Sequence, residues 1–298
     1  MREEVAINPV RVPYSPTLSF LPAHWWSRLL THLLLIMGAL LMLYPALWML
    51  SASFKPSDEI FSDPGLWPHT FTLENYVNGW NALDTSFGTF FLNSLIVCSL
   101  VVVGTVVSCS LAAYAFARLQ FALRNFLFAV MLGTIMLPGS ILIVPQYILF
   151  KNLGWLNTFL PLTIPRFLGT DAFFIFLQVQ FIRTIPTELD DSARIDGCGP
   201  FQLYWRMIVP LSVPALATTA IFAFLAAWGD FFSQLIYLND QSLYTVPVAL
   251  SSFVDSTGAS DYGAVFAMGI LSLLPILIIF LLFQRFLIER IATSGWKG

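Results

Sequence analysis

The residues best suited to carry function stand in a polar segment, residues 184–214, that separates two long apolar runs. Three acids lie close together in it, Glu188, Asp190 and Asp191, and Gly197 follows them. The chain contains no GxxxxGK[ST] phosphate-binding loop. The cluster therefore predicts a docking element for a soluble partner that supplies energy, and a solvated, self-capped loop helix is the alternative interpretation.

The spacing within the polar segment predicts two short helices joined by a sharp turn. Pro186 suits a helix start, and Thr187 stands three residues before Asp190, as in a capping box with Asp in place of Glu. We therefore assign Asp190 to capping. Gly197 and Gly199 can stop the helix with positive φ, and Pro200 can start the second helix. That helix is expected to turn an aromatic face to the bilayer interface, formed by Phe201, Tyr204 and Trp205.

A second group of candidate residues lies inside apolar runs, where ionisable side chains are costly and usually functional. One hypothesis is that Trp228, Asp230 and Gln234 line a solute path, since carboxylates and aromatic faces commonly hold sugars. The alternative is that Asp230 bonds another helix or a partner chain. Arg166 and Asp171 stand in an earlier run, where Arg166 either pairs with Asp171 or extends towards the bilayer surface.

The composition is that of a polytopic membrane protein. Of the 298 residues, 57% are hydrophobic and 10% are charged, whereas soluble domains carry about a quarter charged residues. A net charge of −3 argues against a nucleic-acid partner. We expect no metal site, because the spacing of the cysteines and histidines fits neither a disulfide framework nor a metal centre. These residues are Cys98, Cys109, Cys198, His24, His32 and His69.

Six apolar runs are long enough to cross a bilayer, which takes about 20 residues of helix. Backbone groups in lipid must bond internally, and the alternation of barrel strands is absent, so we expect helices. The runs cover residues 29–50, 90–116, 126–150, 160–182, 213–238 and 265–283. The predicted fold is therefore all-α, with six transmembrane helices and the polar segment between the fourth and the fifth.

Lys and Arg residues predict the orientation of these helices. All but three of the 14 fall on the side that holds both termini and the polar segment, and the positive-inside rule makes that side the cytoplasm. The exceptions are Lys55 and Lys151 on the other side and Arg166 within the fourth run. The long outer loops, residues 51–88 and 239–263, are candidates to contact a partner outside.

The polar segment also fits a longer pattern, P-x-E-L-x-[ED]-[AS]-A-x-I-D-G. The matching residues are Pro186, Glu188, Leu189, Asp191, Ser192, Ala193, Ile195, Asp196 and Gly197. This pattern resembles the EAA loop of permease subunits of ATP-binding-cassette (ABC) importers, in particular the second permease of the carbohydrate class, the maltose and glycerol-phosphate type. Asp191-Ser192-Ala193 stands where that family usually has Glu-Ala-Ala, and Gly229 stands where it usually has Asn.

The similarity extends over nearly the whole chain. Shorter pieces that resemble the same class are Ser53-Phe54-Lys55, the YAFARL stretch at 114–119, the Pro138 and Pro145 pair, Gly154 and Trp228-Gly229-Asp230-Phe231. Each piece alone is weak evidence for this class. Because the pieces occur together, in the expected order and on six predicted spans, the combined resemblance is specific.

The resemblance implies a membrane-spanning permease subunit of an ATP-driven, binding-protein-dependent importer for a sugar or sugar-like solute, in a prokaryotic inner or plasma membrane. It implies no enzyme activity in this chain, because ATP and Mg²⁺ would bind a separate cytoplasmic ATPase dimer. A second, homologous permease and an external solute-binding protein would complete the assembly.

The resemblance also implies a layout. Cytoplasmic tails would cover residues 1–28 and 289–298, and a six-helix permease domain would cover 29–288 with its coupling loop at 184–213. The residues implied to contact the ATPase are Glu188, Leu189, Asp191, Ser192, Ala193, Ile195, Asp196 and Gly197.

Two other classes of function make different predictions. An ion-coupled secondary transporter predicts paired carboxylates near the membrane midplane and broken helices in matching halves, whereas Asp230 stands alone in a late run. An intramembrane enzyme needs convergent nucleophiles, acids or metal ligands within the spans, and the runs contain no such set. ATP-dependent uptake together with co-purification of an ATPase would separate the importer from both.

Overall fold

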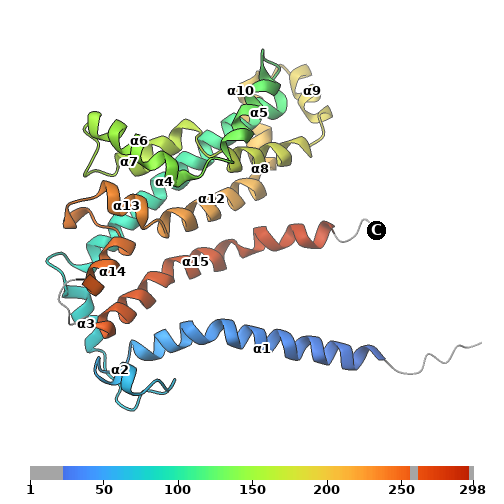
Figure 1. Cartoon of the computed structure of the whole chain (residues 1–298). Coiled ribbons are helices and arrows are strands. Elements are labelled where there is room, and N and C mark those ends of the chain that lie inside the picture. Colours follow the sequence, from blue (N-terminus) through green and yellow to red (C-terminus); the bar gives the residue numbers. More distant parts are fainter. Residues whose placement is uncertain (1–22, 256–260, 295–298) are drawn as a thin grey trace, which may run out of the picture. The chain divides into compact units, whose positions relative to one another are not determined.

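The computed structural model describes residues 23–255 and 261–294, and every regular element in these ranges is helical (Figure 1). The all-α prediction is confirmed. The described residues fall into two compact units that divide between Leu47 and Trp48. The tail residues 1–22 and 295–298, with the charges Arg2, Arg11 and Lys297, lie outside the described residues.

Helix α1 spans Ala23–Ala52 and contains Pro45. Its stretch Arg28–Ala52 has a mean hydropathy of 2.2 and is long enough to cross a membrane. The predicted first span is therefore a helix.

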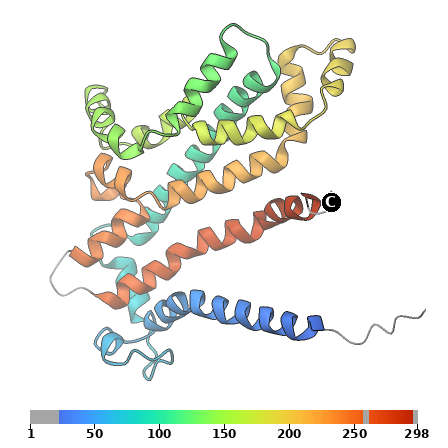
Figure 2. The same cartoon turned by 45° about the vertical axis from the view of Figure 1, so that its right-hand side comes forward.

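Helix α4, Phe87–Arg118, is the element around which the second unit is built. Helices α8 (Ala172–Arg183) and α12 (Val213–Trp228) run alongside it in both views (Figures 1 and 2). Residues of α4 belong to all three buried apolar clusters of this unit. A close approach at Gly104 contributes to this packing, because a Cβ there would lie 2.7 Å from the Phe167 ring.

The predicted third span is broken in the middle. It forms α5 (Arg124–Thr134) and α6 (Gly139–Asn152), which meet at an angle of 100°. Pro138 has extended backbone angles, and a proline also disfavours helical geometry in the residue before it. The prediction of one continuous helix over 126–150 is therefore wrong.

Two further predicted spans are interrupted. The fourth consists of α7 (Leu160–Thr163), the 3₁₀ turn η1 (Ile164–Leu168) and α8, with Gly169 at φ +66° between the last two. The fifth ends as α12 at Trp228, and the rest of the run forms the separate helix α13, Phe232–Tyr237. By length and composition, the described residues hold four helices able to span a membrane, or six spans if each of two bent pairs counts as one.

The last helix, α15, covers Tyr262–Ser294 and contains Pro275. It packs against α12 and against two helices of the outer loops. Those loops contain α2 (Glu59–Ser62), α3 (Glu74–Asn81), η3 (Gln241–Leu243) and α14 (Val246–Asp255).

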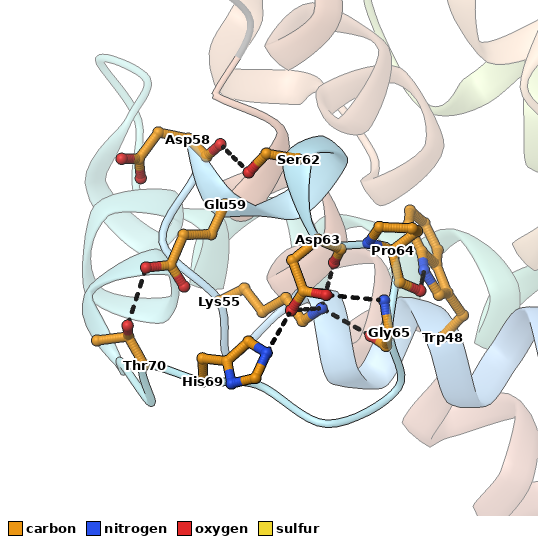
Figure 3. A network of polar contacts seen from close by, with 10 residues as sticks. All are labelled: Trp48, Lys55, Asp58, Glu59, Ser62, Asp63, Pro64, Gly65, His69 and Thr70. Carbon is orange, nitrogen blue, oxygen red and sulfur yellow. Dashed lines mark hydrogen bonds and ion pairs between the residues drawn. The ribbon is translucent and has the colours of Figure 1, made fainter.

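Lys55 organises the first outer loop (Figure 3). Its side chain is almost fully buried, and Nζ donates to the backbone oxygens of Asp63 and Gly65 at 2.6 Å each and lies 3.3 Å from Asp63 Oδ2. The indole of Trp48 donates to the Pro64 oxygen at 3.1 Å. Residues 55–65 therefore form a loop with a fixed shape, although they contain little regular structure.

Candidate functional site

The polar segment forms two short helical pieces with a sharp turn between them, as predicted. The first is α9, Glu188–Ile195; the second runs through α10 (Pro200–Leu203), the π-helical turn η2 (Tyr204–Ile208) and α11 (Val209–Leu211). Figure 2 shows α9 (yellow) at the end of α4 and α8 rather than alongside them.

Gly197 makes the turn after α9; the prediction of a positive φ at Gly199 is wrong, because Gly199 has φ −72° and precedes α10 in an extended conformation. Gly197 has φ +84°, its N–H donates to the Arg194 oxygen at 3.0 Å, and the Cys198 N–H donates to the Ala193 oxygen at 2.9 Å. This pair of bonds is a Schellman cap, in which the left-handed residue is usually glycine. No atom lies within 4 Å of a Cβ placed at Gly197, so the requirement for glycine is conformational rather than steric.

Asp190 does not cap α9. The Thr187 side chain makes no capping bond, and the Asp190 carboxylate instead forms an ion pair with Arg118, with Nε and Oδ2 3.2 Å apart and side chains 4% and 6% exposed. Arg118 also donates from Nη2 to the Ile185 oxygen at 2.6 Å. The predicted capping role is wrong, because the tertiary fold brings an arginine of α4 to the buried side of α9.

Arg118 is the last of three polar residues that α4 presents to the polar segment at intervals of four, which places them on one helix face. The Ser110 and Tyr204 hydroxyls are 2.7 Å apart, and the Tyr114 hydroxyl donates to the Pro200 oxygen at 2.9 Å. The polar segment is therefore fastened to α4 at three successive points.

The predicted aromatic face of the second piece is only partly present. Phe201 and Trp205 are 70% and 63% exposed, but Tyr204 is 4% exposed and bonded to α4. Tyr204 therefore holds the segment in place rather than facing a bilayer surface.

The predicted partner-contacting residues divide between two faces of α9 and its turn. Ala193 is buried in the apolar cluster that includes Tyr114 and Tyr204. Ile195, the last residue of α9, is 86% exposed. The exposed members of the set are Glu188, Leu189, Asp191, Ser192, Ile195, Asp196 and Gly197.

A second site lies where the interrupted spans break. A cavity of about 560 Å³, here called the Asp230 hollow, is lined by residues of α5, α6, α7, η1, α8 and α13 and by Asp230 itself. Of the three residues predicted to line a solute path, Asp230 lies in this lining. Its Oδ1 accepts a hydrogen bond from the Ser233 N–H at 3.1 Å.

The other two predicted path residues do not line the Asp230 hollow. Trp228 is 3% exposed, and its indole donates to the Ser272 oxygen on α15 at 3.1 Å. Gln234 is 2% exposed; its Nε2 donates to the Ala227 oxygen at 3.0 Å, and its Oε1 accepts from the Thr245 hydroxyl. Both side chains hold neighbouring segments of this chain together.

Arg166 and Asp171 form an ion pair at the edge of the same hollow. Arg166 Nη1 lies 2.7 and 2.8 Å from the two carboxylate oxygens of Asp171. Of the two interpretations left open by the sequence, the pair is the one observed.

The Lys55 network is a feature that sequence reasoning missed, although the Ser53-Phe54-Lys55 motif pointed to the place. Hydrogen bonds from the Gly65 N–H and from Lys55 hold the pKa of Asp63 below its ordinary value. The loop that follows presents Trp67, which is 85% exposed. Within the part of the chain that the structure describes, no group of three His, Cys, Asp or Glu residues could hold a metal ion.

Comparison with known proteins gives consistent matches. Residues 104–293 match the family model described as binding-protein-dependent transport system inner membrane component. The probable ABC transporter permease protein YurM of Bacillus subtilis (strain 168) is 34% identical over 255 residues, 86% of this chain and 84% of that protein. The trehalose/maltose transport system permease protein MalG of Thermococcus litoralis is 34% identical over 276 residues, 91% of this chain and 99% of that protein.

Solved structures include a chain with the same fold. It comes from the crystal structure of a bacterial ABC transporter involved in the import of the acidic polysaccharide alginate, and it superposes with a TM-score of 0.79 at 22% identity, covering 89% of this chain and 98% of that chain.

Proposed function

Since the chain belongs to the family of binding-protein-dependent transport system inner membrane components, it is a permease subunit of an ABC importer, and we propose that its solute is a sugar or oligosaccharide. It is a multi-pass membrane protein, and its partners include a solute-binding protein and an ATPase. An ion-coupled secondary transporter is not favoured. The sugar class is supported by the name of the trehalose/maltose relative, whose alignment covers nearly the full length of both chains.

In this proposal the exposed face of α9 binds the ATPase, which holds ATP and Mg²⁺ on the cytoplasmic side. The observation that carries it is the two-sided character of α9. One side is fixed to the chain's own core through Asp190 and Ala193, while the other exposes acids together with Leu189 and Ile195. A helix that served only to connect two spans would not need an exposed isoleucine beside a buried ion pair.

We further propose that α4 carries the motion of α9 into the membrane. The three contacts at Ser110, Tyr114 and Arg118 join the polar segment to a helix of 32 residues. An α-helix resists bending over this length, so displacement of its end by the ATPase moves the whole span. A second permease would complete the path from the other side.

The outer loops are the proposed seat of the binding protein. The buried Lys55 fixes the shape of the first outer loop, and a loop that is ordered before binding loses less conformational entropy when it binds. Exposed aromatic side chains such as Trp67 are typical anchors of protein interfaces.

Co-purification tests the ATPase contact. We would express the complete importer with Ile195→Asp and measure the amount of ATPase that purifies with the tagged permease. We expect at least a tenfold loss, because the substitution places a carboxylate in the proposed apolar contact. Val77→Asp is the matched control, since Val77 is 63% exposed in an outer loop. ATPase retention equal to that of the control would contradict the proposed role of α9.

A further inference from the structure

Three interruptions of the helices converge on the Asp230 hollow. Its lining includes Gly139 at the start of α6, Asp171 at the start of α8 and Asp230 between α12 and α13. These interruptions are far apart in the sequence and have different local causes. Non-helical backbone at membrane depth is tolerated where it is buried in protein or lines a water-filled cavity.

The interruptions also lie at similar depths. Counted from the ends nearest the polar segment, α5 has 11 residues, α8 has 12 and α12 has 16, which correspond to roughly 16, 18 and 24 Å at 1.5 Å per residue. The hydrocarbon core is about 30 Å thick. The hollow therefore lies within the membrane, between the middle and the outer side.

The charges of the hollow are unbalanced. The Arg166 guanidinium is neutralised by Asp171 at 2.7 Å. Asp230 has one bond, from the Ser233 N–H to Oδ1, and its Oδ2 has no partner among residues 23–255 and 261–294. Apolar side chains and neutral polar groups, the latter including Gln146, Thr170 and Tyr237, form the rest of the lining.

Helix α4 contacts the backbone of the Arg166–Asp171 segment that lines the hollow. The Ser108 hydroxyl donates to the Arg166 oxygen at 2.7 Å, and the Cys109 thiol lies 3.8 Å from the Asp171 oxygen. Ser110, the next residue of the same helix, binds the polar segment through Tyr204. One helix therefore fixes the hollow and the proposed ATPase contact within a few residues of each other.

We propose that the Asp230 hollow is the site at which the importer binds its solute within the membrane, and that this site accepts an uncharged, hydroxyl-rich molecule. The free Asp230 oxygen accepts hydrogen bonds from solute hydroxyls, and its negative charge disfavours carboxylated or phosphorylated sugars. The paired Arg166 is not available as an anion ligand without breaking its ion pair. The assignment of a solute to the hollow rests on the proposed importer function.

Thiol labelling tests whether the hollow is wet and negatively charged. Ser233→Cys would be introduced into the complete importer after replacement of the three native cysteines. We would compare its reaction with a cationic trimethylammonioethyl and an anionic sulfonatoethyl methanethiosulfonate. We expect both reagents to label the introduced cysteine. After each rate is divided by the rate of the same reagent with a free thiol in solution, the cationic reagent should be about tenfold or more faster than the anionic one, because the Asp230 charge acts at close range in a medium of reduced dielectric. Asp230→Asn should remove most of this preference, and Asp84→Asn, in an exposed outer position, should leave it unchanged. No labelling, or a preference that survives Asp230→Asn, would overturn the proposal.

Uptake tests the solute class. Proteoliposomes with the wild-type importer and its binding protein would be offered radiolabelled maltose, trehalose and an alginate trisaccharide. We expect import of at least one neutral sugar and no import of the acidic one, with Asp230→Asn lowering neutral uptake about tenfold, the effect of losing a hydrogen bond to a charged group. Import of the acidic sugar, or of none of the three, would overturn the assignment. ATPase co-purification is measured in the same preparations, so that loss of the ATPase from the wild type would count against the proposed function instead.

Discussion

The ion pair between Arg118 and Asp190 offers the sharpest test of how the polar segment is connected to the membrane helices. The two side chains are 4% and 6% exposed. Replacing Arg118 by Met keeps most of the buried stem and removes the charge. Asp190 is then left as a buried carboxylate without a counter-charge.

The structure sets the size of the effect. Removal of one partner from a buried ion pair costs about 3–5 kcal/mol. Here Arg118 Nε and Asp190 Oδ1 lack hydrogen bonds, so the pair is less than ideal and the lower end, about 3 kcal/mol, applies. That is roughly a hundredfold shift in the equilibrium between bound and released α9. An eight-residue helix is not stable alone, so α9 would lose its fixed position.

Uptake and ATP hydrolysis by the assembled importer are the assays. We expect Arg118→Met to lower uptake at least tenfold while hydrolysis by the complex continues, because the ATPase can no longer move α4 through α9. Arg183→Met is the control. Arg183 is the last residue of α8, and the contact described for its side chain is with the Phe128 ring, whose centroid lies 5.3 Å from Cζ. Restoration of part of the uptake by Arg118→Asp combined with Asp190→Arg would show that the pair itself matters. Wild-type uptake by Arg118→Met would refute the reasoning.

Three other changes probe the segments on either side of the membrane. At Gly197, φ of +84° costs most residues with a Cβ about 1–2 kcal/mol. We expect Gly197→Val to insert but to lower uptake about tenfold, with Gly197→Asn and Gly197→Asp retaining more activity because Asn and Asp tolerate this conformation. Lys55→Met removes the donor to the backbone oxygens of Asp63 and Gly65, and a hydrogen bond to a charged group contributes about 1.5–3 kcal/mol. We therefore expect faster hydrogen exchange over residues 55–65, whereas a variant of exposed Lys151 should not change that exchange. The pKa of Asp63 is lowered in the fold, so its contribution to stability is complete above the ordinary pKa of about 3.9 and is lost as pH falls through the lower folded value. After correction for the intrinsic pH dependence of amide exchange, the protection of the same loop should be constant from pH 8 to pH 5, and loss of protection near pH 6 would contradict this account.

Local properties of the sequence were sufficient for the fold class and for the turn after α9. Apolar runs of about 20 residues indicate helices whatever they pack against, because backbone groups in lipid have no other partners. Gly197 could be placed in its turn for a similar reason, since the left-handed conformation is a requirement of one residue. The EAA-like pattern likewise indicated α9, but it did not separate the exposed residues from Ala193, which is buried.

The tertiary structure alone decided which side chains meet. Arg118 and Asp190 are 72 positions apart, and no local pattern distinguishes an acid that caps its own helix from one that pairs with a distant arginine. The same holds for Lys55, whose partners are backbone oxygens that any residue type could supply. Prolines and glycines such as Pro138, Gly169 and Gly229 can interrupt a helix, but that the interruptions beside them meet at one hollow depends on how α5, α8 and α12 pack around α4. Long-range contacts of this kind arise from the packing of whole helices, and so they have no signature in the residues of a single segment.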